Sequence, residues 1–245
     1  RDLPSFRALL RAVEAQFYQS IDLPGPTLDL GCGDGHFASL TFDRSLDAGL
    51  DPWPDSLREA RGRGAYRLLV QADGAAAPFP SGHFASAVSN SVLEHILHID
   101  EVLAETARVL RPGAPFVFCV PNPRYFSALS LRHLLGKGYV DWFRRVSRVC
   151  HADDPELWQD RLEKAGFRLE RWWHYFPPAA MRVLEWGHYL GVPSLFARKL
   201  TGRWILAPTR WNLWLTQRLL QKYAAAEPVE EGTFTFYIAM KDRRP

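Results

Sequence analysis

Leu28-Asp29-Leu30-Gly31-Cys32-Gly33-Asp34-Gly35-His36-Phe37-Ala38 is the most informative part of this chain. A short apolar strand runs into three glycines spaced two apart, and the pattern then predicts a helix. Alternate glycines let the backbone turn sharply and approach a ligand that any Cβ would push away. The N–H groups at the start of the helix favour an anionic group at the same place. A tight strand-to-helix turn with no ligand is the plainer interpretation, so the neighbouring sequence has to decide.

Acidic residues follow the next apolar runs at regular intervals. Leu46 to Asp51 predicts a second strand that ends in a carboxylate, where a parallel α/β unit hydrogen-bonds ribose hydroxyls. A third run, Tyr66 to Ala72, precedes Asp73. The remaining elements of this half are a strand at 85–88, a helix at 100–110 that stops at Arg111-Pro112-Gly113, and a strand at 114–120. This order predicts a doubly wound, mostly parallel sheet.

At this point the chain resembles the class I methyltransferases that use S-adenosylmethionine. The motifs are, in order, Leu-Asp-Leu-Gly-Cys-Gly-Asp-Gly, Gly-Leu-Asp, Asp73, Pro-Phe-Pro-Ser-Gly-His-Phe, Val-Leu-Glu-His-Ile and Arg-Val-Leu-Arg-Pro-Gly. The resemblance covers roughly residues 25–123, with pieces near 151–170 and 233–241. It implies a Rossmann-like, seven-stranded sheet whose last strand is antiparallel, with S-adenosylmethionine as cofactor and S-adenosylhomocysteine as product.

Details of the motifs bear on competing cofactors. A dinucleotide fold prefers Gly-x-Gly-x-x-Gly, whereas this loop reads Gly-x-Gly-x-Gly with His36 at the last position, which disfavours a nicotinamide or flavin enzyme. The chain departs from the methyltransferase pattern at Ala85, where the family has an aspartate, and at Gly113-Ala114, where it has two glycines. We interpret both as the loss of a turn detail that leaves cofactor binding intact.

The resemblance also implies which residues bind the cofactor. The glycine loop would approach the methionine portion, and Asp29 would anchor its amino end. Asp51 would take the ribose hydroxyls and Asp73 the adenine amine, although ordinary capping could account for either carboxylate. Ser89 would border the sulfonium. The complete predicted set is Asp29, Gly31, Cys32, Gly33, Gly35, Asp51, Pro52, Asp73, Gly74 and Ser89.

Catalysis needs few dedicated groups, because the sulfonium already carries a good leaving group and positioning supplies much of the rate. An oxygen nucleophile of high pKa would need a general base, for which histidine is the usual choice. We favour His151, which precedes a predicted helix carrying Trp158, over His95, which belongs to a motif seen across the family whatever the substrate. The other candidates are His98, His174 and His188. Three scattered cysteines are too few for a zinc site, and no metal is expected.

Length and composition suit one α/β domain with an appended lobe, since 245 residues with 47% hydrophobic side chains can bury a large core. No apolar run reaches the roughly 18 residues needed to span a bilayer, and no signal peptide is apparent, so we expect a cytoplasmic protein. The predicted organisation is an N-terminal helix in 1–24, a cofactor core in 25–123, a substrate-covering insertion in 124–150, the rest of the sheet in 151–175 and 232–245, and a helical aromatic and basic lobe in 176–231.

The net charge of +3 is unevenly distributed. Residues 124–150 carry +5 and residues 177–223 carry +6, which leaves −8 for the remainder. Four tryptophans of the lobe accompany this charge, and 210–223 predicts an amphipathic helix with a stripe of Trp211, Trp214, Leu215, Leu219 and Tyr223. The lobe could be a lid packed on its own tryptophans, a contact with an anionic membrane surface, or a nucleic-acid site. Nucleic acid is disfavoured, because Ser-Asn-Ser-Val stands at 89–92 where base-amino methylases carry Asn-Pro-Pro-Tyr.

The sequence therefore predicts methyl transfer from S-adenosylmethionine to a small, hydrophobic or amphipathic acceptor, with O-methylation favoured. Two alternatives stay open. One is a non-catalytic module that binds S-adenosylmethionine or S-adenosylhomocysteine, and the other is a methyltransferase for a lipid-linked substrate at the membrane surface. The acceptor and the oligomeric state are not specified by the sequence.

Overall fold

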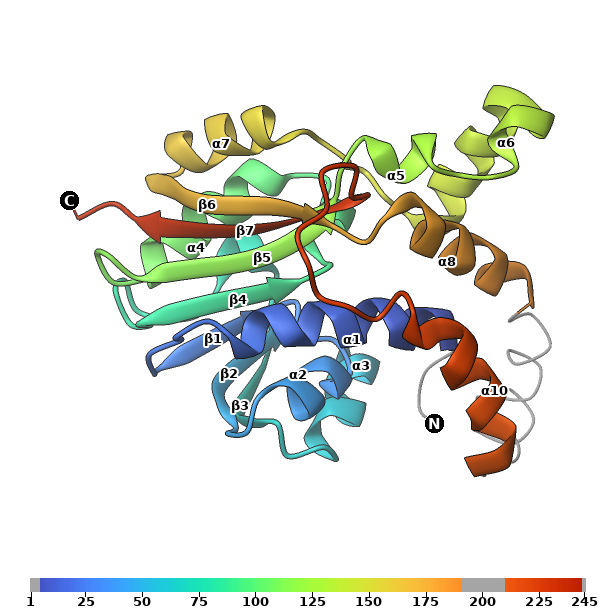
Figure 1. Ribbon diagram of the computed structural model, residues 1–245. Coiled ribbons are helices and arrows are strands. Elements are labelled where there is room, and N and C mark those ends of the chain that lie inside the picture. The colour runs from blue at the N-terminus through green and yellow to red at the C-terminus, as the bar shows by residue number, and fades with distance from the viewer. Residues whose placement is uncertain (1–4, 191–209, 244–245) are drawn as a thin grey trace.

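A computed structural model describes residues 5–190 and 210–243. Its centre is one seven-stranded sheet in the order β3-β2-β1-β4-β5-β7-β6 (Figure 1). The pairs among β1 to β5 are parallel, whereas β7 is antiparallel to both β5 and β6. The predicted Rossmann-like α/β sheet with an antiparallel last strand is confirmed.

The strands and helices keep the order that the sequence predicts. The strands are β1 Thr27–Leu30, β2 Leu46–Asp51, β3 Tyr66–Gln71, β4 Ser86–Asn90, β5 Pro115–Pro121, β6 Phe167–Tyr175 and β7 Phe234–Lys241. The helices are α1 Ser5–Gln19, α2 His36–Thr41, α3 Pro54–Arg61, α4 Ile99–Val109, α5 Arg124–Ser127, α6 Arg132–Ser147, α7 Pro155–Lys164, α8 Pro178–Leu190 and α10 Arg210–Gln221, with short 3-10 turns η1 Gly74–Ala76 and η2 Leu93–His95.

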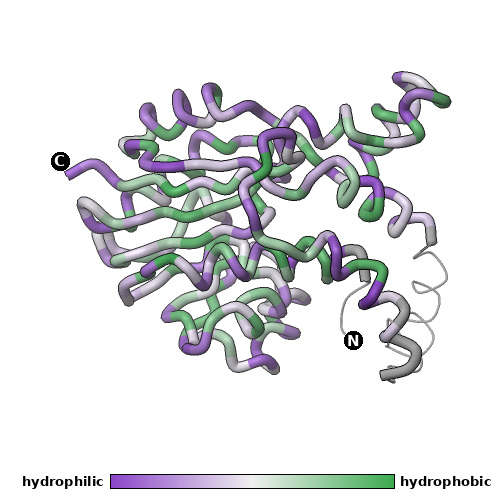
Figure 2. Tube along the Cα trace, in the orientation of Figure 1, coloured by the Kyte–Doolittle hydropathy of each residue, from purple (hydrophilic) through white to green (hydrophobic). Residues whose placement is uncertain are grey.

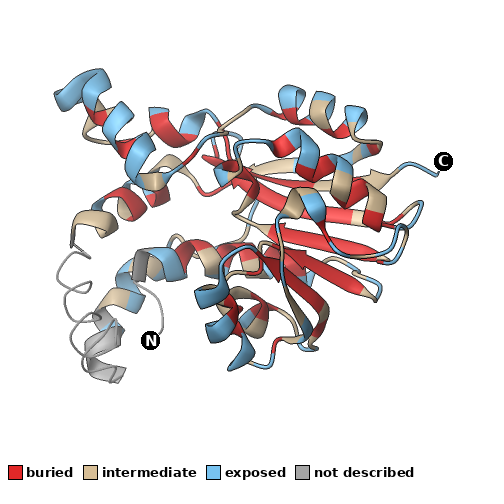
Figure 3. Ribbon diagram, turned by 180° about the vertical axis from the view of Figure 1, so that it is seen from behind, coloured by how far each residue is buried: buried red, intermediate tan, exposed pale blue. Residues whose placement is uncertain are grey.

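Both faces of the sheet are covered, because successive side chains of a strand point to opposite faces. Along β5, Phe116 and Phe118 join the apolar cluster under α4 and α7, whereas Val117 and Cys119 join the cluster under α1. Figure 2 shows the central strands, β5 among them, largely in the hydrophobic colour, and Figure 3 shows these strands buried between the helical layers. The sheet is thus the middle layer of three.

Local signals account for most of the element boundaries. The carboxylate of Asp154 accepts a hydrogen bond from the N–H of Leu157 at 3.0 Å, and Pro155 occupies the first turn, so these two residues fix the start of α7. The predicted end of the fourth strand at Val88 is wrong by two residues. Pairing with β5 extends β4 to Asn90, and this shift moves the candidate site along the chain.

The insertion and the lobe are helical and gather at the end of the sheet where the parallel strands finish (Figure 1). In α10, Trp214 and Leu219 of the predicted stripe are exposed, whereas Leu220 and Tyr223 pack against the core. The side chains of Trp211 and Leu215, and the whole of Phe196 and Trp204, lie outside the described residues. Among the described helices, none is long and apolar enough to cross a membrane.

Candidate functional site

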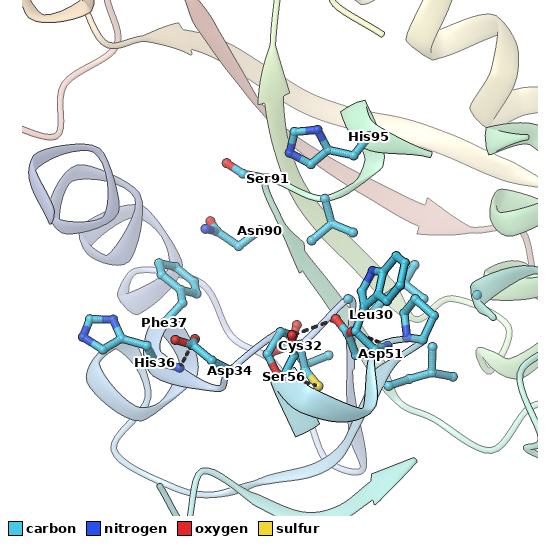
Figure 4. A pocket seen from close by; sticks show the side chains of 18 of the residues that line it. Leu30, Cys32, Asp34, His36, Phe37, Asp51, Ser56, Asn90, Ser91 and His95 are labelled. Atoms are coloured by element: carbon cyan, nitrogen blue, oxygen red, sulfur yellow. Dashed lines mark hydrogen bonds between the residues drawn. The ribbon is translucent and has the colours of Figure 1, made fainter. Parts of the chain in front are cut away.

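A cleft of about 730 Å³ opens where β1, β2 and β4 end. Its lining comes from the loops that follow these three strands and β3, from the first turns of α2 and α3, and from one face of α1. The strand order reverses between β1 and β4, and open α/β sheets bind ligands at such a switch point. The volume is within the range of small-molecule and cofactor pockets. Figure 4 shows how the labelled side chains surround this space.

The glycine loop forms the floor of the cleft. Gly31 has a φ of +75°, and a Cβ there would lie 2.3 Å from the Val92 side chain. Gly33 has a φ of +54°, and a Cβ there would meet nothing within 4 Å. Gly31 is therefore required for the close approach of the loop that follows β4, whereas Gly33 leaves its backbone open to the cleft.

Asp51 connects the glycine loop to the loop after β2. Its Oδ2 accepts a hydrogen bond from the Gly33 N–H at 2.9 Å, and its Oδ1 accepts one from the Trp53 N–H at 2.9 Å. Each carboxylate oxygen has a second lone pair with which it could accept a ligand hydroxyl. Pro52 and Trp53 line the cleft beside it, and Trp53 is 67% exposed. Trp53 is a lining residue that the motifs did not indicate, although an aromatic residue just after the acidic strand end was a visible signal.

The other acidic residues of the predicted set also reach the cleft. Asp73 accepts a hydrogen bond from the Ala75 N–H at 2.9 Å and caps the turn that contains Gly74. Asp29 is buried and accepts a hydrogen bond from the Tyr66 hydroxyl at 2.6 Å. Burial raises the pKa of Asp29 to about 7, and the nearby Asp51 charge adds to the increase. Asp29 is thus partly protonated near neutral pH.

The Cys32 thiol lines the cleft between two of the glycines. It is 8% exposed, and its burial, together with the charges of Asp29 and Asp51, raises its pKa well above the usual range. The thiol therefore stays protonated, and a thiolate nucleophile at this position is disfavoured.

Ser89, which the resemblance placed beside the sulfonium, is fully buried and is not among the residues that line the cleft. Its Oγ donates to the Leu30 carbonyl at 2.9 Å, and its own carbonyl accepts from the Tyr18 hydroxyl at 3.1 Å. Because β4 continues further than predicted, Asn90 and Ser91 take this place at the cleft wall (Figure 4).

A buried carboxylate on α1 organises that wall. Glu14 is 0% exposed, and its Oε2 accepts from Arg11 Nη1 at 2.6 Å and from Asn90 Nδ2 at 2.8 Å. Its Oε1 accepts from Ser91 Oγ at 3.1 Å and from the Tyr175 hydroxyl at 3.0 Å. Ser91 also has a φ of +51°, a conformation that costs energy for a non-glycine residue and needs such support. No local sequence pattern indicates this network, because Glu14 lies 76 residues from Asn90 and 161 residues from Tyr175.

Two arginines bring positive charge into the cleft from α1. Arg7 and Arg11 both line it, and the Arg11 guanidinium lies 5.9 Å from the centre of the Phe37 ring. Burial lowers the pKa of Arg11, but the Glu14 ion pair and the nearby Cys119 and Glu94 together outweigh burial, so the pKa is raised above the usual value. The side chain is 22% exposed. The cleft therefore has a carboxylate at Asp51 and guanidinium groups where α1 crosses it, one of them paired with Glu14.

Of the two histidines proposed as a general base, His95 lines the cleft. Its Nδ1 lies 2.9 Å from the Arg148 carbonyl, which can only accept, so Nδ1 carries the proton of the neutral ring. Its Nε2 keeps a lone pair and lies 3.8 Å from Glu94 Oε1, beyond hydrogen-bond distance. Burial lowers the pKa of His95, and the nearby Arg11, Arg7 and Arg148 charges lower it further. The ring is therefore neutral at pH 7 and can accept a proton.

His151, which the sequence analysis ranked first, does not line the described cleft. Its Nε2 lies 2.9 Å from the Ile96 carbonyl, and its Nδ1 lies 3.3 Å from Asp153 Oδ2, so both ring nitrogens already face protein groups. The geometry thus reverses the order of the two candidates. No described residue of the insertion 124–150 or of the aromatic lobe lines this cleft either, and α1 forms the wall instead.

These features fit S-adenosylmethionine. The open backbone at Gly33 suits close approach of a ligand, and the carboxylates of Asp51 and Asp73 are placed for hydroxyl and amine donors. The Arg11 guanidinium, where α1 crosses the cleft, suits the carboxylate of the cofactor. The fold and the cleft together define an α/β protein with a nucleoside-type ligand site at the switch point of its sheet.

Comparison with known proteins agrees with this class. Residues 28–118 match a family model described as a methyltransferase domain. An S-adenosylmethionine-dependent methyltransferase from Mesorhizobium loti superposes with a TM-score of 0.59 over 95% of this chain and 100% of its own, at 20% identity. Residues 28–118 thus identify a class I S-adenosylmethionine-dependent methyltransferase domain in this chain.

Two mycobacterial relatives are similar in sequence. A fatty-acid O-methyltransferase of Mycolicibacterium smegmatis is 39% identical over 104 residues, covering 40% of this chain and 38% of that protein. An uncharacterised protein of Mycobacterium tuberculosis is 35% identical over 172 residues, covering 69% of this chain and 56% of that protein. The matches thus span between about a third and just over half of these relatives' own length.

Proposed function

We propose that this protein transfers the methyl group of S-adenosylmethionine to an oxygen atom of a small amphipathic acceptor. The observation that carries the proposal is the composition of one cleft, where His95 and two arginines are lining residues together with the glycine loop and Asp51. The fold alone would not suffice, because the [4+2]-cyclase SpnF superposes on this chain with a TM-score of 0.58, at 19% identity over 97% of this chain and 81% of its own.

The bound cofactor supplies an electrophilic methyl group, so the protein has to orient the acceptor and manage one proton. Arg7, which lines the same end of the cleft, would attract an acceptor that carries negative charge. The unprotonated Nε2 of His95 would take the proton from a hydroxyl acceptor as the oxygen attacks. A carboxylate acceptor is already ionised at neutral pH and would need no base.

The fatty-acid O-methyltransferase relative makes a carboxylate the first acceptor class to test. The basic end of the cleft supports the same choice, because a fatty acid joins an anionic head to an apolar chain.

We place the protein in the cytoplasm, where the free thiols of Cys32, Cys119 and Cys150 would stay reduced.

Mass spectrometry tests this proposal. The protein is incubated with S-adenosylmethionine that carries a deuterated methyl group and with hexadecanoic acid, hexadecanol or a simple phenol as acceptor. We expect the label on the acid, on the hydroxyl compounds, or on both, and an acid product that diminishes in Arg7→Gln. If the protein binds S-adenosylmethionine but labels none of these acceptors, the O-methylation proposal is wrong, and the non-catalytic module becomes the better interpretation.

A further inference from the structure

Two helices outside the cleft, α6 and α8, expose large apolar side chains that are not part of the buried core. On α6, Trp142 is 41% exposed and Val146, one turn later, is 55% exposed. On α8, Trp186 is 45% exposed. We call these three side chains, together with the exposed Arg145 and Arg182 of the same helices, the α6/α8 face. Figure 3 shows how much of α6 is exposed at this end of the molecule.

The tryptophans are held in place by the residues beneath them. The Trp142 ring stacks on Tyr189 with centres 6.1 Å apart and planes at 15°, and Trp186 meets the same ring edge-on at 6.1 Å. The Tyr189 hydroxyl lies 2.6 Å from the Tyr139 hydroxyl, which donates to the buried Glu185 carboxylate. The polar groups of this cluster therefore point inward, and the two indoles are presented outward on a fixed base.

Glu185 also joins the two helices into one unit. Its Oε2 accepts from the Ser130 backbone N–H at 2.6 Å and from the Ser130 hydroxyl at 2.7 Å, just before α6 begins. The carboxylate is 0% exposed, so its negative charge does not reach the surface. Of the two described helices, α6 and α8, Asp141 of α6 is then the one exposed acidic residue near these arginines.

The positive charge of residues 124–150 indicates which class of partner the α6/α8 face would bind. Residues 124–150 contain six arginines and lysines against one aspartate. A second copy of the chain would bring two such surfaces together, and like-charge contacts of this kind are unfavourable. Tryptophan side chains with neighbouring arginines are typical of helices that lie in the headgroup region of a membrane, and anionic lipids add attraction for each basic residue.

We propose that the α6/α8 face docks on the surface of an anionic lipid bilayer. Trp142, Val146 and Trp186 enter the headgroup region, and Arg145 and Arg182 contact lipid phosphates. The face belongs to the same end of the sheet as the cleft (Figure 1), so a docked protein would meet amphipathic acceptors where they concentrate. The proposal concerns binding alone and is independent of methyl transfer.

Co-sedimentation of the purified protein with vesicles tests it. The vesicles are either pure phosphatidylcholine or phosphatidylcholine with one third phosphatidylglycerol, at low and at high salt. The variants are Trp142→Ala and Arg145→Gln. The matched controls are Trp172→Ala on β6, where the indole is also 41% exposed, and Arg168→Gln on the same strand. Thermal unfolding establishes that each variant is folded, and Trp186→Ala replaces Trp142→Ala if that variant is not.

We expect binding to the anionic vesicles that weakens with salt. It should fall by about tenfold in Trp142→Ala, from the loss of buried apolar surface, and by about fivefold in Arg145→Gln. The control variants should bind as the unaltered protein does. Equal binding by all variants would overturn the assignment of this face. Absence of pelleting at low salt would overturn membrane docking altogether, and so would a dimer in solution that Trp142→Ala dissociates.

Discussion

Replacing Glu14 with alanine should damage both the stability of the fold and the cleft. The side chain is fully buried and accepts hydrogen bonds from Arg11, Asn90, Ser91 and Tyr175. Removing it leaves four donors without their acceptor and one guanidinium without its counter-charge. The cleft wall formed by Asn90 and Ser91 loses its support at the same time.

The size of the effect follows from the burial of the pair. Removing one partner of a buried ion pair costs roughly 3–5 kcal/mol. Because the Arg11 side chain is 22% exposed, water can replace part of the lost interaction, so we expect the lower end, about 3 kcal/mol. Tyr175→Phe removes only one of the four hydrogen bonds and should cost about 1 kcal/mol.

Urea unfolding followed by circular dichroism measures both values, and calorimetry on the folded variants measures cofactor affinity. Glu14→Ala should also bind S-adenosylmethionine several-fold more weakly, because Arg11 and Ser91 are no longer held at the cleft. The reasoning is refuted if Glu14→Ala is as stable as Tyr175→Phe, or if its cofactor affinity is unchanged. Gln16→Ala, on the exposed side of α1, is the matched control.

Three further substitutions test single features. Gly31→Ala should abolish cofactor binding, because the new methyl group would collide with Val92 and because the positive φ of Gly31 is unfavourable for alanine. An unchanged cofactor affinity in calorimetry would disprove this. Burial raises the pKa of Glu94 from 4.5 to about 8, so the folded state holds its proton more tightly. Its contribution to stability is present below pH 4.5 and is lost as the pH rises to about 8, and Glu94→Gln should flatten this dependence in urea titrations. With a hydroxyl acceptor, His95→Gln should lower turnover by about a hundredfold and remove an acidic limb below pH 6.5, whereas an unaltered pH profile would exclude the base role.

The sheet could be predicted because its signals are local. Gly31 and its neighbours, the carboxylate at Asp51 and the cap at Asp154 each act within a few residues of the chain. Strand boundaries were less accurate where long-range pairing decides them. Ser89 and Asn90 are polar, yet they pair with Phe118 and Cys119 of β5, and this pairing extends β4 beyond the predicted end.

The wall of the cleft could not be predicted, because its contacts join distant parts of the chain. Glu14 lies 76 residues from Asn90 and 161 residues from Tyr175. Its position among the apolar residues of α1 predicts a buried carboxylate that needs hydrogen-bond partners, but the sequence does not say which residues provide them. The position of the histidines could not be predicted for a related reason. The backbone N–H of His151 donates to the Glu94 carbonyl, so His151 lies close to His95 and yet outside the cleft.

Isothermal titration of the protein with S-adenosylmethionine, compared between Asp51→Ala and Asp160→Ala, is the most direct test that this cleft is the cofactor site. Asp160 is a half-exposed carboxylate on α7 that pairs with Lys164, so its loss should leave the affinity unchanged. We expect Asp51→Ala to weaken binding by about 1.5–3 kcal/mol, the range for hydrogen bonds to a charged group. Equal affinities in the two variants, or no binding by the unaltered protein, would contradict the account.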